Sequence, residues 1–235
     1  MSAPLSAALL QRLAAFDTPT ICNALEQVAP ATQATGYTHR PLLCGFPTEA
    51  PMVGYARTAT IRAKAPPSGT RAEVRALRAA YYRYVEAGPA PAIVVIEDLD
   101  GPDAGFGAFW GEVQSAIHRG LGARGLVTNG SVRDIDQWAP GFGFLAGSVS
   151  PSHAYANLVA FGTAVDVAGM RVQDGDLIHA DRHGAVVIPR EAVDGVADAA
   201  ARVAAREARI LAVARAPHCT AESLLRTFDE LDEIH

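Results

Sequence analysis

Apolar residues recur every three or four positions in several stretches of the chain, which is the spacing of one face of an α-helix. Asp17 followed by Thr18 and Pro19 resembles a helix cap with proline at an early helical position, so a helix should begin there. A short helix is expected at the C-terminal end of the chain. The other predicted helices span residues 5–15, 21–27, 72–87, 108–119 and 191–215.

Strands are predicted from alternating or continuous apolar runs. Residues 53–62 alternate, whereas residues 93–97 and 125–128 are largely apolar and suit strands buried on both faces. A glycine-rich loop over 101–107 and a predicted helix separate the last two, so the order is that of a βαβ unit with parallel strands. Residues 143–189 predict short β segments joined by turns. The pattern indicates an α/β fold in one domain, residues 1–235, because no repeat or long linker divides it.

Composition excludes several classes of protein. The 235 residues are 49% hydrophobic and 19% charged, with a net charge of -5. These values predict a core-forming protein and argue against a nucleic-acid partner. No uninterrupted apolar run is long enough to span a membrane. Three cysteines without CxxC spacing and the lack of a signal-peptide pattern predict a cytoplasmic location.

Lysine is nearly absent. Among 20 basic residues only Lys64 is a lysine, and it precedes Ala65-Pro66-Pro67 rather than following a phosphate-binding loop. Schiff-base aldolases, pyridoxal-phosphate enzymes and P-loop NTPases each need a lysine at a fixed place. If the chain acts on a carbonyl compound, a metal or an arginine must therefore stabilise the negative charge.

The stretch from residue 107 to 138 carries the best candidate chemistry. Gly111, Glu112 and Val113 lie near the start of a predicted helix, whose free N–H groups favour an anion. Arg133 and Asp134 follow the next strand, and ligands of α/β folds bind beyond the carboxyl ends of strands. An arginine, an aspartate and a helix N-terminus should converge there. Alternatively, Arg133 and Asp134 simply pair and cap a short helix over 134–138.

Two motifs in this stretch resemble a known family. Glu112 is followed by twenty residues and then Arg133-Asp134, and residues 125–134 fit Gly-x-Val-x-x-Gly-x-Val-Arg-Asp. This pattern resembles the RraA-like family, which includes regulators of ribonuclease E and divalent-metal-dependent 4-hydroxy-4-methyl-2-oxoglutarate aldolases. The resemblance extends over residues 15–215.

The resemblance implies a fold and a function. The fold would be a swivelling β/α sandwich with a central mixed sheet flanked by helices, a long C-terminal helix, and assembly as a trimer or hexamer. The function would be a lyase that cleaves or decarboxylates a 2-oxo acid through a pyruvate enolate, with Mg²⁺, Mn²⁺ or another divalent metal. The alternative is a non-catalytic, protein-binding regulator of an RNA-processing enzyme.

The resemblance also implies roles for individual residues. Asp134 would ligate the metal and Arg133 would hold the keto or enolate oxygen. Backbone N–H groups from Gly111 to Gln114 would hold the pyruvyl carboxylate. Glu112 replaces an aspartate that is usual in the aldolases, and Asn129 stands near a position where they carry an acid. These departures leave the substrate open.

Glu207 interrupts the apolar stripe of the predicted helix 191–215. A carboxylate is costly to bury unpaired, so Glu207 either reaches solvent at a rim or serves the metal site of a neighbouring subunit, as a glutamate does in the aldolases. Glu222 is the alternative carboxylate for that role.

Histidines offer further candidates. His153 follows Pro151-Ser152 in a loop that could line the pocket, with equal weight for and against contact with substrate. His179, Asp181 and His183 alternate on one face of a strand, but the following glycine favours a β-turn over a metal site.

Overall fold

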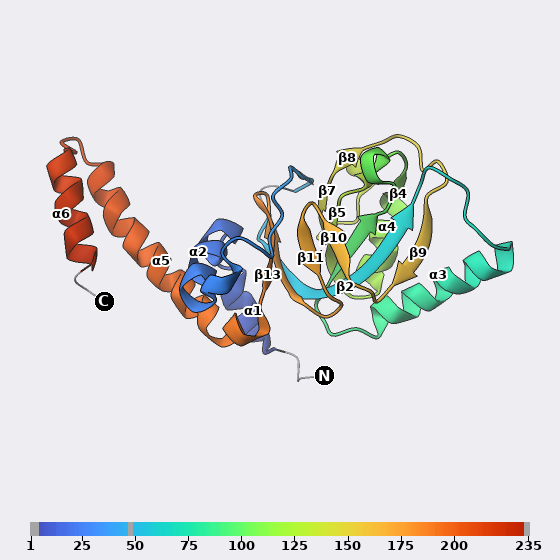
Figure 1. Cartoon of the computed structure of the whole chain (residues 1–235), viewed down its shortest axis with the longest axis horizontal. Helices are drawn as coiled ribbons and strands as arrows, with labels where there is room; N and C mark the ends of the chain where they lie inside the picture. The colour runs from blue at the N-terminus through green and yellow to red at the C-terminus, as the bar shows by residue number, and fades with distance from the viewer. Residues whose placement is uncertain (1–4, 47–48, 233–235) are drawn as a thin grey trace.

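The computed structural model describes residues 5–46 and 49–232, and eight strands in these ranges form one curved, mixed sheet (Figure 1). Its order is β1–β7–β5–β3–β2–β12–β13, with β9 also paired to β2. The strands are β1 Leu43–Cys44, β2 Met52–Arg62, β3 Ala92–Asp98, β5 Ala123–Thr128, β7 Gly143–Ala146, β9 Asn157–Phe161, β12 Leu177–Asp181 and β13 Gly184–Ile188.

The centre of the sheet is the predicted βαβ unit. β2, β3, β5 and β7 are parallel neighbours, and Ile96 of β3 stands opposite Thr128 of β5. Because both strands end at the same edge, the loops after them emerge side by side. The predicted parallel strands and the α/β class are therefore confirmed.

Helices lie on both sides of the sheet (Figure 1). The Asp17 carboxylate accepts the N–H of Thr20, so the predicted cap is confirmed. Thr70 and Glu73 form a reciprocal capping box at the next helix. The helices are α1 Ala7–Leu13, α2 Thr18–Val28, α3 Arg71–Glu86, α4 Glu112–Gly120, α5 Val193–Ala214 and α6 Ala221–Asp232. None of them is long and apolar enough to cross a membrane.

Two predicted helix starts are wrong. The helix expected over 108–119 begins at Glu112, because β4 (Ala108–Trp110) pairs with β6 (Ser131–Val132) in a small parallel sheet completed by β8 (Ser148–Val149). Strand pairing and burial of Trp110 outweigh the helical pattern of the sequence here. The helix expected from residue 191 also begins later, after a 3₁₀ turn at Arg190–Ala192.

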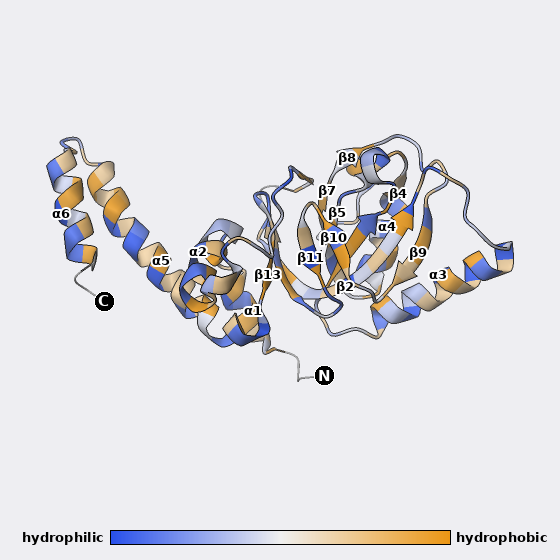
Figure 2. Cartoon of the chain, in the orientation of Figure 1, coloured by the Kyte–Doolittle hydropathy of each residue, from blue (hydrophilic) through white to orange (hydrophobic). Residues whose placement is uncertain are grey.

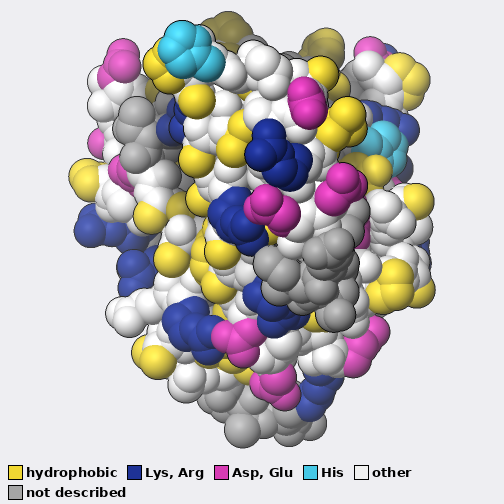
Figure 3. Space-filling model, turned by 90° about the vertical axis from the view of Figure 1, so that its left-hand side faces the viewer, with side chains coloured by type: hydrophobic (Ala, Val, Ile, Leu, Met, Phe, Trp, Pro, Cys, Tyr) yellow, Lys and Arg dark blue, Asp and Glu magenta, His cyan; other side chains and the backbone are white. Residues whose placement is uncertain are grey.

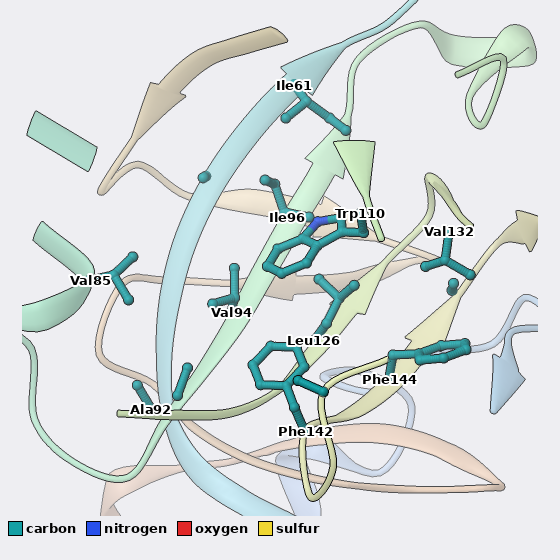
Figure 4. Close-up of a cluster of buried hydrophobic side chains, with 14 of the residues drawn as sticks. Ile61, Val85, Ala92, Val94, Ile96, Trp110, Leu126, Val132, Phe142 and Phe144 are labelled. Carbon is teal, nitrogen blue, oxygen red and sulfur yellow. The ribbon is translucent and has the colours of Figure 1, made fainter. Parts of the chain in front are cut away.

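The core on the α3–α4 side of the sheet is aromatic. Trp110, Leu126 and Phe142 point toward one another in Figure 4, and the rings of Trp110 and Phe142 stack with centroids 5.9 Å apart. This cluster includes the buried part of α3 and the strand that leads into α4. It therefore fixes α4 relative to the ends of β3 and β5.

A second cluster joins α1, α2 and the first half of α5 to β12 and β13. Beyond Val203, no residue of α5 is buried, and α6 folds back against it. We call residues 204–232 the C-terminal arm. Figure 1 shows this arm leading away from the sheet, at the opposite end of the molecule from α3.

Candidate functional site

A cavity of about 290 Å³ lies beside the N-terminus of α4. Gly111, Val113 and Gln114 line it from that helix, and Arg133 and Asp134 line it from the loop after β6. The loop containing His153 and the inner face of α3 close the other sides. The structure thus gathers most of the residues singled out in the sequence around one space.

Asp134 has an unusual backbone conformation. Its φ of 52° and ψ of 43° lie in the left-handed region, which an aspartate tolerates better than most residues. The preceding residue is fixed by a bond of 2.9 Å from the Arg133 N–H to the Trp110 carbonyl. This conformation turns the Asp134 side chain back toward α4.

Gly111 leaves the room that Asp134 needs. A Cβ at Gly111 would lie 2.5 Å from Asp134 Oδ2 and 3.1 Å from Arg133 Cγ. Any side chain at position 111 would therefore displace the Asp134 carboxylate. The glycine at the helix start is required by close approach, since its own φ of -168° is open to any residue.

Arg133 and Asp134 interact loosely. Arg133 Nε lies 3.4 Å from Asp134 Oδ2, and 35% and 40% of the two side chains are exposed. The Glu112 N–H donates to the same oxygen at 3.4 Å. Asp134 precedes a 3₁₀ turn, Ile135–Gln137, but its side chain makes no capping hydrogen bond. The pairing alternative is thus present, whereas the capping alternative is not, and the carboxylate stays open to the cavity.

A buried hydrogen-bond chain supports the first turn of α4. His118 Nδ1 lies 2.7 Å from the Gln114 carbonyl, which can only accept, so Nδ1 carries the proton. Nε2 then accepts from the Tyr81 hydroxyl at 2.8 Å. Burial lowers the pKa of His118 to about 4, which keeps the ring neutral at physiological pH. α3 and α4 are therefore tied together directly behind the cavity.

Comparison with known proteins identifies the family. The sequence model of the Aldolase/RraA family, described as RraA-like, matches residues 18–187. The chain belongs to the RraA-like family. A 105-residue stretch is 33% identical to an uncharacterized protein of Methanocaldococcus jannaschii, and this match covers 44% of the chain and half of that protein.

Solved RraA-like structures share the fold. An uncharacterized protein from Pseudomonas syringae superposes with a TM-score of 0.73 over 97% of each chain, at 21% identity. RraAS2 of Streptomyces coelicolor, described as an unusual member of the RNase ES inhibitor RraA family, gives 0.67 over 88% of this chain and 98% of its own, at 20% identity. The RraA-like family includes both lyases and non-catalytic regulators, so the activity must be argued from the site.

Three of the candidate carboxylates do not line the cavity of this RraA-like chain. Glu112 occupies the first position of α4 with an exposed side chain, and only its main chain contacts Asp134. Glu207 lies on α5, where it accepts a bond of 3.2 Å from Asn23 Nδ2 in a separate groove between α2 and α5. Glu222 lies in the first turn of α6. α5 and α6, which carry Glu207 and Glu222, extend from the molecule on the side away from α3 and α4 (Figure 1).

The histidine candidates separate clearly. His153 lines the cavity, with Nδ1 2.9 Å from the Ala154 carbonyl. His179 is fully buried between Thr18 Oγ1 and the Leu13 carbonyl. Asp181 accepts the N–H groups of Thr18 and His183. His179 and Asp181 thus fix the start of α2 and a turn, as the β-turn interpretation requires.

Asn129 has a structural role that the sequence analysis missed. Its Oδ1 accepts the Asp98 N–H at 2.8 Å, and its Nδ2 donates to the Asp98 carbonyl at 3.0 Å. Only an amide side chain can make both bonds to one main chain. Asn129 therefore clips together the ends of β3 and β5, from which the site loops emerge.

Arg78 is the cavity residue that the sequence analysis did not find. Val74, Arg78 and Tyr81 line the cavity from α3 at spacings of four and three residues, which is one face of a helix. The apolar members of this stripe were visible in the sequence. The arginine shares this spacing, but spacing alone does not show that the stripe borders a cavity.

Proposed function

We propose that this chain is a divalent-metal-dependent lyase that cleaves or decarboxylates a 2-oxo acid through a pyruvate enolate. The observation that carries the proposal is the opening of Arg133 and Asp134 into one cavity at the N-terminus of α4. A cation, a metal-binding carboxylate and a helix N-terminus are the groups that this chemistry needs when no lysine is available.

The donor set fits Mg²⁺ or Mn²⁺. Mg²⁺ usually keeps several waters and takes one or two carboxylates, and the half-open Asp134 carboxylate supplies one. No group of three or more His, Cys, Asp or Glu side chains in the described residues could form a closed metal cage. When bound, such an ion supplies a Lewis acid for the 2-oxo group of the substrate.

The remaining residues bind and orient the substrate. The N-terminus of α4, from Gly111 to Gln114, presents its partial positive charge to the carboxylate next to the keto group. Arg133 donates a hydrogen bond to the keto oxygen, and this bond becomes stronger as that oxygen becomes anionic. The C3–C4 bond then breaks, and its electron pair enters the enolate. C4 leaves as carbon dioxide in decarboxylation, or as a carbonyl product whose C4 hydroxyl proton passes to a base in cleavage. C3 later takes a proton, which gives pyruvate. His153 borders the space where the departing fragment would lie.

The proton donor is proposed to come from another subunit. Glu207 lies outside the cavity of its own chain and at the start of the C-terminal arm, so assembly as a trimer or hexamer could bring it to a neighbour's cavity. Glu112, exposed next to Asp134, remains the carboxylate available within the same chain. Subunit mixing between Glu207→Ala and Asp134→Ala proteins distinguishes Glu207 from Glu112 as the proton donor.

Pyruvate release from oxaloacetate tests the proposal. Coupled to lactate dehydrogenase, wild type with Mg²⁺ should release pyruvate well above the rate in buffer with Mg²⁺ alone, and EDTA should abolish the difference. The Asp134→Ala protein serves as the matched control for metal held elsewhere on the chain. A wild-type rate equal to that control would overturn the lyase proposal and favour a binding protein.

A further inference from the structure

The arginines of α3 divide between two faces of the helix. Arg71, Arg75 and Arg83 line a shallow outer surface together with alanines. Arg78 alone lines the cavity, between Val74 and Tyr81 on the inner stripe. Arg78 is exposed, so its charge is open to the cavity and can meet a charged ligand there.

Arg78 has no hydrogen bond or ion pair within residues 5–46 and 49–232. The nearly buried Arg57 shows the contrast, since it is held by the Asp174 carboxylate, the Tyr84 carbonyl and the Tyr84 ring. Arg78 and Arg133 line the cavity together with one carboxylate, that of Asp134. The site thus carries excess positive charge even before a metal is bound.

Other polar groups of the cavity are already engaged. The Asn157 amide donates to the carbonyls of Arg62 and Tyr155, and His153 Nδ1 is bonded to a main-chain carbonyl. The remaining surface near α3 is apolar, with Phe109 and Leu158. Apolar surroundings strengthen the attraction between a guanidinium and an anion. Arg78 is therefore the group best placed to bind an anionic group at the end of a ligand farther from α4.

We propose that Arg78 binds a second anionic group of the substrate, at the end away from the 2-oxo acid, and so determines specificity for dicarboxylates. The position of the first carboxylate, at α4, rests on the proposed function. The size agrees: about 290 Å³ holds roughly ten water volumes, and 2-oxoglutarate has about ten non-hydrogen atoms. A guanidinium fork matches a carboxylate geometrically, whereas a neutral end group would leave Arg78 without a counter-ion.

Two ligands of equal chain length test this role by calorimetry in the presence of Mg²⁺. 2-Oxoglutarate ends in a carboxylate and 2-oxopentanoate ends in a methyl group. Wild type should prefer 2-oxoglutarate by about tenfold or more, the range expected for one charged hydrogen-bonded pair. Arg78→Gln should bring the two affinities within about twofold of each other, chiefly by weakening 2-oxoglutarate.

Arg75→Gln is the matched control, because Arg75 is an exposed arginine on the outer face of the same helix. It should keep the wild-type preference, which separates a specific contact from a change in net charge. Arg78→Lys should retain part of the preference, since it keeps the charge without the fork. Equal thermal melting of the variants establishes that α3 is intact.

Failure of this inference is distinguishable from failure of the proposed function. If wild type shows no preference for 2-oxoglutarate, or if Arg78→Gln keeps that preference, Arg78 does not bind the distal carboxylate, whatever the rate of pyruvate release. If the preference depends on Arg78 but no pyruvate is released from oxaloacetate, the dicarboxylate site stands and the lyase assignment falls.

Discussion

The cavity and the C-terminal arm differ in how completely one chain builds them. At the cavity, main-chain bonds, the missing Cβ of Gly111 and the Tyr81–His118 pair fix the position of each functional group. Along the arm, Leu225 and Phe228 are 62% and 38% exposed, and Leu211 is 40% exposed. Figure 2 shows hydrophobic and hydrophilic residues alternating along α5 and α6, and Figure 3 shows apolar side chains mixed with charges of both signs at this end of the molecule.

The difference separates two kinds of residue. Arg133 and Asp134 meet within a single chain, so their substitution should act on that chain's own site. Glu207 can meet a cavity only if a second chain supplies it, because the arm and the cavity lie at opposite ends of the molecule (Figure 1). The following experiments test this contrast.

Removal of the metal-binding charge should have the largest effect. Asp134→Asn keeps the shape of the side chain, so the fold should survive while turnover at limiting Mg²⁺ falls about 1,000-fold, or about 4 kcal/mol of lost charge stabilisation. Steady-state pyruvate release over a Mg²⁺ titration measures it. Wild-type turnover at limiting Mg²⁺ would remove Asp134 from the metal site.

Arg133→Lys should come next, with kcat lowered about 100-fold and KM raised much less. Lysine keeps the charge but loses the planar fork, and the oxygen carries more charge in the transition state than in the ground state. The relative size of the effects on kcat and on KM shows which substrate oxygen Arg133 contacts. A higher KM with an unchanged kcat would place Arg133 on the substrate carboxylate instead.

The free energy of unfolding should depend on pH through His118, which is buried behind the cavity. Burial lowers the pKa of His118 in the folded protein to about 4, from the ordinary histidine pKa of 6.5. As the pH falls below 6.5, His118 therefore takes up a proton in the unfolded chain before it does so in the folded protein. Stability from the neutral ring is full above that value and is lost between 6.5 and about 4. Between pH 7.5 and pH 5 the loss should be about 2 kcal/mol for this group.

Urea unfolding at the two pH values of wild type and His118→Gln measures this contribution. The variant should be less stable at pH 7.5 but should lose less on acidification. His218→Gln, an exposed histidine between α5 and α6, is the control and should keep the wild-type pH dependence. If the free energy of unfolding changes equally between the two pH values in wild type and His118→Gln, His118 is not buried as a neutral ring.

Mixing two inactive proteins tests the arm. If Glu207 serves a neighbour's cavity, exchange of subunits between Glu207→Ala and Asp134→Ala should restore about a quarter of the sites in a cyclic trimer at equal amounts. Pyruvate release is measured after exchange has been verified by a mass tag. No recovery, a monomer by light scattering, or full activity of Glu207→Ala alone would each place the carboxylate function elsewhere, with Glu112 as the next candidate.

The sequence predicted the convergence of the site but not its boundaries. The ends of parallel strands must share an edge, so Arg133 and Asp134 could be placed near the start of α4 from the strand pattern alone. The start of α4 itself was misplaced, because pairing of Trp110 with β6 is a contact between residues far apart in the chain. Arg78 was missed because helical spacing shows which residues share a face, not what that face meets.

The Asn129 clip also constrains how this protein could change over generations. Replacing Asn129 with aspartate would exchange an amide donor for an oxygen facing the Asp98 carbonyl, whose partner bond is 3.0 Å long. Aspartate at this position would therefore weaken the connection between the ends of β3 and β5. A second substitution would have to restore that connection, so the order in which the two mutations arise would matter.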